Sequence, residues 1–187
     1  PDISYRERGR GQALIFVHGT AAAARRWEPV STQFTQGKRI VEYDRRGRGQ
    51  SGDNKAYDLA AEVGDLVDLI RQIGEPADVV AHSHGALITL NALCQHPAVF
   101  RRAVLFEAPL AFTGECNFID PDEVTRLEQV RQTQGNAAAT EFFLREFPRA
   151  SEQDIAALKA LESWPERCAA APTLARELSA AHNFRAD

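Results

Sequence analysis

The chain has 187 residues, with 22 basic against 26 acidic side chains and a formal net charge of −4. That length predicts one domain or one domain with a small addition, and a hydrophobic fraction of 44% is ordinary for a soluble globular protein. The charge balance gives no reason to expect nucleic acid or a membrane as a partner, and no apolar run approaches the ~18 residues of a membrane span.

Two smaller features of the composition support these exclusions. The basic cluster RRGRG at 45–49 is solitary in an acidic chain, so an RNA-binding role for it is the weaker interpretation. The three cysteines, Cys94, Cys116 and Cys168, are odd in number, widely spaced and without a CxxC pair. This number and spacing of cysteines indicate that the thiols are reduced, and we therefore expect a cytoplasmic protein.

Four short apolar runs predict the buried strands of a parallel sheet. Each is rich in β-branched or aromatic residues and is followed by glycine, proline or polar residues. The runs occupy residues 12–17, 38–43, 77–81 and 101–106.

Helical patterns lie between these runs. Residues 59–73 place their apolar side chains on one face, with Asp58 as a cap and Gly74 at the end. Residues 85–95 are apolar on nearly every side, which predicts a buried helix, and a weaker helix is expected around 27–35. The alternation of strands and helices predicts an α/β fold with a doubly wound, mostly parallel sheet.

The pattern changes after residue 109. Only helices are predicted from 120 to 184, starting near Asp120, Asn136, Ser151 and Pro172. We therefore interpret 1–109 as an α/β core and 110–187 as a helical insertion. Four aromatic residues of the insertion either line an apolar pocket or, as we favour, pack its core: Phe142, Phe143, Phe147 and Trp164.

The stretch AHSHGA at 81–86 stands where a predicted strand passes into a helix. A serine on such a sharp turn exposes its hydroxyl, and small residues are needed two positions to either side, as in Gly-x-Ser-x-Gly. Ala81 replaces the first glycine and Gly85 keeps the second. Ser83 is thus the predicted nucleophile, whereas Ser51, within GQSG, has no helix after it and is interpreted as a loop residue.

Three motifs in this order resemble the α/β-hydrolase fold family: HGT at 18–20, YDRRGRGQSG at 43–52 and AHSHGA. The resemblance covers 3–109 closely, and the helical insertion resembles the family's cap. It implies an oxyanion hole made by the backbone N–H groups of His84 and of Thr20 or Ala21. We expect His18 to tie loops together, and Asp44 and Arg46 to hold their loop by hydrogen bonds near the pocket floor.

No histidine in the chain is an obvious base for Ser83. His82 and His84 adjoin it in sequence, where correct aiming of the ring is rare; we expect His82 to be buried and His84 to face the pocket or a loop. In the family the acid and the histidine follow later strands, so the sequence predicts a fragment cut at both ends. Within the given chain, Glu107 and His182 are the weaker candidates for the catalytic acid and the histidine base.

The leading functional hypothesis is a serine hydrolase that acts on small esters, amides or lactones. A cofactor-free dioxygenase, haloperoxidase or C–C hydrolase, and a ligand-binding member without activity, stay open as alternatives. No metal-ligand spacing and no dinucleotide motif is found, so we expect no cofactor. The expected partner is a small-molecule substrate, and the oligomeric state is left open.

Overall fold

A computed structural model describes residues 1–34, 36–54, 57–74, 76–110 and 119–184. Cys116 lies outside these ranges. The chain divides into two compact units, Pro1–Pro109 and Leu110–Asp187, and each is described by itself. None of the helices in the described ranges combines the length and apolar character that crossing a membrane requires.

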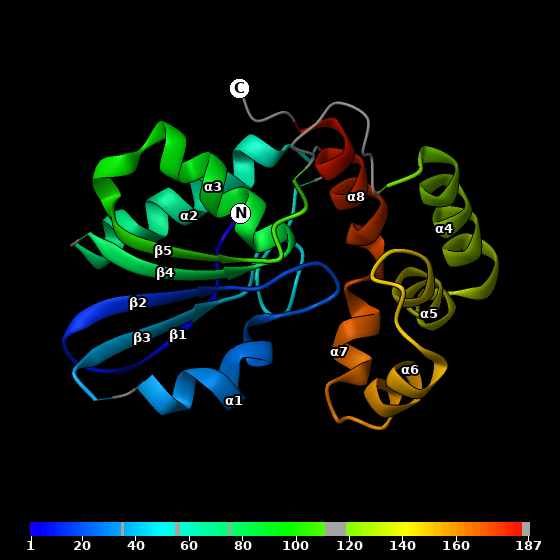
Figure 1. Cartoon of the computed structure of the whole chain (residues 1–187), viewed down its shortest axis with the longest axis horizontal. Helices are drawn as coiled ribbons and strands as arrows, with labels where there is room; N and C mark the ends of the chain where they lie inside the picture. Colours follow the sequence, from blue (N-terminus) through cyan, green and yellow to red (C-terminus); the bar gives the residue numbers. More distant parts are fainter. Residues whose placement is uncertain (35, 55–56, 75, 111–118, 185–187) are drawn as a thin grey trace. The chain divides into compact units, whose positions relative to one another are not determined.

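The first unit contains a five-stranded sheet with the order β1-β3-β2-β4-β5 (Figure 1). Strand β1 runs antiparallel to β3, and the remaining neighbours are parallel. The predicted α/β class with a mostly parallel sheet is confirmed. The strands are β1 (Tyr5–Gly9), β2 (Gln12–Val17), β3 (Lys38–Tyr43), β4 (Ala77–His82) and β5 (Phe100–Phe106).

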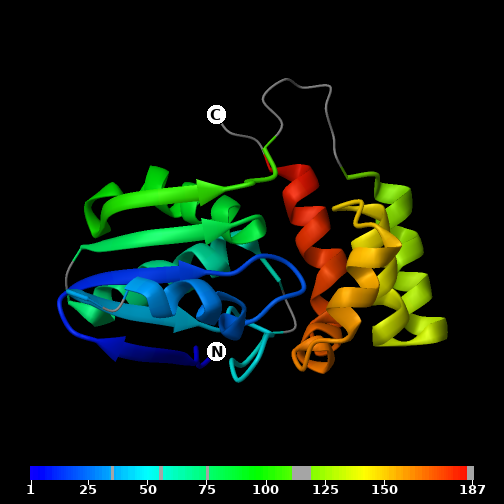
Figure 2. The ribbon, with the colours of Figure 1, turned by 60° about the horizontal axis from the view of Figure 1, so that its bottom comes forward.

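Helices cover both faces of this sheet (Figures 1 and 2). Helices α2 (Leu59–Ile73) and α3 (His84–Gln95) pack on one face, where Ile15, Leu66 and Ile88 belong to the main core. On the other face Phe16 packs against Trp27. The helix predicted around 27–35 is broken into η1 (Ala24–Trp27), α1 (Glu28–Ser31) and η2 (Thr32–Phe34).

The ends of α2 follow the sequence prediction. The carboxylate of Asp58 accepts a hydrogen bond of 2.9 Å from the N–H of Ala60, which satisfies one of the free donors at the helix start. Gly74 ends the helix with φ +86°, a left-handed conformation that glycine adopts without steric cost. A short 3-10 turn, η3 (Pro97–Val99), then leads from α3 into β5.

Strand β5 differs from the prediction of a fully buried strand. It lies at the end of the strand order and pairs with β4 alone. Val104 and Phe106 are 58% and 56% exposed, whereas residues of the central strand β2 are almost wholly buried. Within the described part of the chain, β5 is therefore an edge strand with apolar side chains at the surface.

Every secondary-structure element in the described part of the second unit is a helix. The predicted helix starts at Asn136 and after Ser151 are confirmed, and Ser151 forms a reciprocal capping box with Asp154. Phe143 is buried and stacks on Phe147 at 5.7 Å. The elements are α4 (Pro121–Gln134), α5 (Asn136–Glu146), α6 (Glu152–Lys159), α7 (Trp164–Ala169), η4 (Ala171–Thr173) and α8 (Leu174–Asn183); α7 was not predicted.

Candidate active site

Ser83 occupies the tight turn between β4 and α3. Its backbone has φ +53° and ψ −125°, which is strained for a residue with a Cβ atom. The N–H of Ser83 donates a 2.9 Å hydrogen bond to the carbonyl oxygen of Phe106, and this contact ties the turn to the end of β5. The predicted strand–serine–helix arrangement is therefore present.

Small residues surround this turn because other backbone passes close to it. A Cβ atom on Gly85 would lie 2.5 Å from the carbonyl oxygen of His18. A Cβ atom on Gly19 would lie 2.9 Å from the Cβ of Ser83. Ala81 is completely buried. The spacing of small residues in the motif thus reflects direct contact between the turn and the loop that follows β2.

The two histidines beside Ser83 agree with the prediction only in part. His84 is 2% exposed, and its Nε2 contacts the hydroxyl of Tyr57 at 3.0 Å. His82 is half-buried; its ring stacks on Phe106, and its Nε2 contacts a carboxylate oxygen of Glu107 at 3.2 Å. The prediction was wrong for His82, which ends β4 on the pocket side. For His84 the loop alternative holds, because its ring contacts Tyr57 in the loop before α2.

The hydroxyl of Ser83 makes no hydrogen bond to any residue that the structure describes. His82 and His84 are engaged elsewhere, and His182, in the helical unit, contacts the carbonyl oxygen of Ile119 at 2.9 Å. Glu107 has φ +52° and a side chain that is 68% exposed, and its carboxylate contacts His82 rather than Ser83. No histidine in the described residues of the first unit therefore contacts the hydroxyl of Ser83.

His18 ties two loops together, as the sequence predicts. Its Nε2 accepts a 3.1 Å hydrogen bond from the N–H of Arg45, so its Nδ1 carries the proton and donates to the carbonyl oxygen of Gly19 at 2.9 Å. Complete burial and the nearby Arg45 guanidinium hold the pKa of His18 well below its usual value. A neutral imidazole therefore fixes the loop that carries Gly19.

A buried ion pair beneath this loop escaped the sequence analysis. Arg45 and Glu62 are 0% and 1% exposed at the side chain and form two hydrogen bonds of 2.8 and 2.7 Å. Burial alone would raise the pKa of Glu62, but Arg45 and Arg48 lower it well below its usual range. Glu62 lies three residues after Leu59, on the apolar face of α2, and a charge there indicates a buried partner.

The loop after β3 is held by its own side chains. The carboxylate of Asp44 accepts hydrogen bonds from the N–H groups of Ala24 at 2.8 Å and Gln50 at 3.0 Å. Arg46 pairs with Asp65 through two hydrogen bonds of 2.7 and 2.8 Å. Because the guanidinium groups of the RRGRG cluster are buried against protein acceptors, they are not presented to a nucleic-acid phosphate.

Ser51, the alternative serine, is part of the same loop. Its hydroxyl donates to the carbonyl oxygen of Asp44 and accepts from the N–H of Ser4 at 2.9 Å. These contacts link the loop to the start of β1. The interpretation of Ser51 as a loop residue agrees with this geometry.

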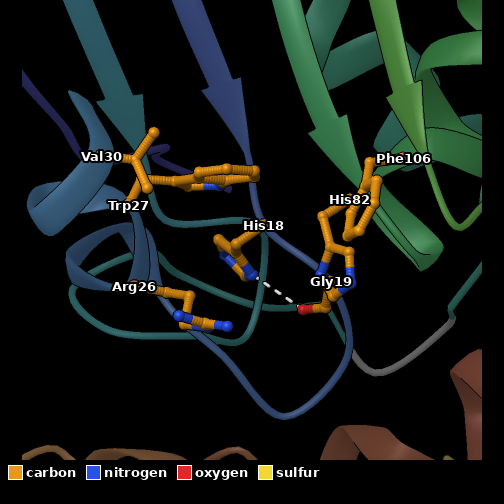
Figure 3. A pocket seen from close by; sticks show the side chains of 7 residues that line it. All are labelled: His18, Gly19, Arg26, Trp27, Val30, His82 and Phe106. Atoms are coloured by element: carbon orange, nitrogen blue, oxygen red, sulfur yellow. Dashed lines mark hydrogen bonds between the residues drawn. The ribbon is translucent and has the colours of Figure 1, made fainter. Parts of the chain in front are cut away.

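A pocket of about 210 Å³ opens next to the serine turn (Figure 3). It lies at the carboxyl ends of the parallel strands, the usual place for ligands in α/β sheets. Trp27 and Val30 form one side, and His82 and Phe106 form the other. The lining residues are His18, Gly19, Arg26, Trp27, Val30, His82 and Phe106.

The two predicted oxyanion donors lie on either side of this turn. His84 is the first residue of α3, so its N–H has no acceptor within the helix. Thr20 follows Gly19 in the turn after β2, and Ala21 next to it has φ +52° and is completely buried. Both candidate backbone segments therefore adjoin the turn that carries Ser83.

A sequence model described as the alpha/beta hydrolase family matches residues 14–186. The chain belongs to this family. A solved alpha/beta hydrolase from Sphaerobacter thermophilus is 28% identical and superimposes with a TM-score of 0.85, covering 97% of this chain and 70% of that structure. The stated resemblance of the three motifs is thus confirmed.

Two curated relatives match a little over half of the chain. The putative non-heme bromoperoxidase BpoC of Mycobacterium tuberculosis is 30% identical over 107 residues, 56% of this chain and 41% of that protein. The (E)-2-((N-methylformamido)methylene)succinate hydrolase of Acinetobacter baylyi is 30% identical over 104 residues, 52% of this chain and 38% of that protein. The chain therefore covers less than half the length of each of these two relatives.

Proposed function

We propose that the protein is a serine hydrolase that cleaves small esters, amides or lactones through Ser83. The observation that carries the proposal is the strained backbone of Ser83, φ +53°, at a strand–helix turn beside a pocket. Such a turn presents the hydroxyl at the mouth of the sheet, where it can attack a carbonyl carbon. The family relationship and the relative from Acinetobacter baylyi, named as a hydrolase, support this choice.

The same turn offers the means to stabilise the reaction. Attack by Ser83 places negative charge on the carbonyl oxygen of the substrate, and backbone N–H groups aimed at this oxygen lower the barrier by ~3–4 kcal/mol per donor. In the proposed mechanism the N–H of His84 is one donor and that of Thr20 is the other. The neutral His18 and the buried Arg45 support the loop that carries Thr20.

The proposed mechanism also needs a base. No described side chain of the first unit contacts the hydroxyl of Ser83, and the proposal assigns the base and its orienting acid to another part of the protein. The base takes the serine proton during attack and returns it to the leaving group. We further propose that the helical unit acts as a cap that governs which substrates reach Ser83.

A haloperoxidase is the second candidate, because BpoC is named as a putative bromoperoxidase. The two candidates are separated by assaying 4-nitrophenyl butyrate hydrolysis and peroxide-dependent bromination in parallel, with protein expressed from its complete reading frame. The proposal expects ester hydrolysis that falls on the order of 10⁶-fold in Ser83→Ala and is unchanged in Ser51→Ala. Bromination without ester hydrolysis would replace the proposal by the second candidate.

A further inference from the structure

The pocket beside Ser83 has an unusual distribution of charge. None of the seven residues that line it is acidic, and one of them is Arg26. Arg26 is exposed, and its guanidinium makes no ion pair or side-chain hydrogen bond with any residue in the described ranges. A permanent positive charge therefore borders the pocket without a protein counterion.

A second donor in the same wall also lacks an acceptor. The indole Nε1 of Trp27 is buried and has no hydrogen-bond partner among the described residues. Figure 3 shows Trp27 and Arg26 on the same side of the pocket, across from His82 and Phe106. Because this nitrogen is buried, Trp27 offers a ligand its apolar ring, and Arg26 is the residue of this wall that can bind a negative charge.

The neighbouring arginine behaves differently. Arg25 lies on the same short helix, is also exposed, and pairs with Glu28 at 4.0 Å. It does not line the pocket. The two residues share charge, element and exposure, so Arg25 is a matched control for Arg26.

We infer that Arg26 selects substrates whose acyl group carries a carboxylate, and that it binds this carboxylate while Ser83 attacks the other end. The planar guanidinium matches a carboxylate with two hydrogen bonds, and Trp27 and Phe106 can contact the apolar chain between the two ends. A cavity of about 210 Å³ is smaller than the ~300 Å³ at which drug-sized pockets begin, which restricts the acyl chain to a short one. This inference rests on the proposed function and specifies its substrate class.

The test compares two esters that differ only in charge: mono-4-nitrophenyl adipate and its neutral methyl ester. The protein, expressed from its complete reading frame, should give a higher kcat/KM for the anionic ester. Arg26→Ala should lower the ratio of anionic to neutral kcat/KM about tenfold, the size of one charge-assisted contact near a surface. Arg26→Lys should recover part of it, and Arg25→Ala should leave it unchanged. An equal ratio in wild type and Arg26→Ala would overturn the inference while the proposed function stands.

A binding measurement without turnover separates the two claims. Amide chemical shifts of the 187-residue chain are followed during titration with monomethyl adipate or dimethyl adipate. Saturable shifts around Trp27 with the monoanion, absent in Arg26→Ala and weakened by raising the salt concentration, support the carboxylate site even if no ester is hydrolysed. Equal shifts with the neutral diester, or shifts that survive Arg26→Ala, would contradict it.

Discussion

The carbonyl oxygen of His18 lies only 2.5 Å from the position that a Cβ atom would occupy at Gly85. This contact explains why a glycine follows the serine by two residues. The loop after β2 and the first turn of α3 touch through backbone, and the loop is thereby held against the proposed nucleophile. The geometry of the turn depends on this approach more than on helix propensity at Gly85.

Gly85→Ala should destabilise the protein although alanine favours helices. The added methyl meets backbone oxygens of Val17 and His18 at 2.7 and 2.5 Å, and overpacking of this kind costs about 1–3 kcal/mol. Gly64→Ala in α2 is the control, because nothing lies within 4 Å of its Cβ; a gain of ~0.5–1 kcal/mol is expected there. Urea denaturation measures both. Similar gains at the two positions would refute the steric argument.

The buried pair of Arg45 and Glu62 should matter for folding. Removing one partner leaves a charge buried without compensation, so Arg45→Met and Glu62→Leu should each cost about 3–5 kcal/mol. The double variant should lose less than the sum, because the coupling between Arg45 and Glu62 is then lost only once. Glu62→Leu and the double variant both leave the buried Arg48, which lies 3.6 Å from Glu62, without this partner. A double-mutant cycle by urea denaturation decides this, and additive losses would contradict direct coupling of the two side chains.

Stability should decrease as the pH falls below 6.5. Burial, with Arg45 nearby, holds the pKa values of His18 and His84 well below 6.5, the ordinary histidine value. Between those lowered values and pH 6.5 the unfolded chain binds more protons than the folded chain. The free energy of unfolding therefore decreases as the pH is lowered through this range.

His84→Gln removes one of the two buried imidazoles, so it should flatten this dependence between pH 6.5 and 5. His96→Gln, at the partly exposed end of α3, is the control and should keep the slope. Urea midpoints across this pH range provide the measurement. An unchanged slope in His84→Gln would mean that His84 is not the source.

Much of the first unit was predictable from the sequence because local signals agree there. The apolar run at 12–17 and the one-sided helix at 59–73 coincide with β2 and α2. Strand β5 was predicted as buried because its apolar content resembles that of central strands, and exposure depends on which elements pack nearby. The residues of β5 alone do not indicate which elements cover the strand.

The site was predictable only in part, for the same reason. Ser83 and Gly85 follow from spacing within one turn. The burial of His82 was predicted wrongly, because successive residues of a strand point to opposite faces and which face borders a pocket depends on tertiary packing. Arg26 lines the pocket through tertiary placement of η1, which no local pattern indicates.

Covalent labelling is the most direct test of Ser83 as the nucleophile. Protein expressed from its complete reading frame is treated with a fluorophosphonate, and the modified peptide is identified by mass spectrometry. The proposal predicts one adduct on Ser83, absent in Ser83→Ala and retained in Ser51→Ala, because only Ser83 stands at the strained turn beside the pocket. An adduct that persists in Ser83→Ala, or one located on Ser51, would contradict the account.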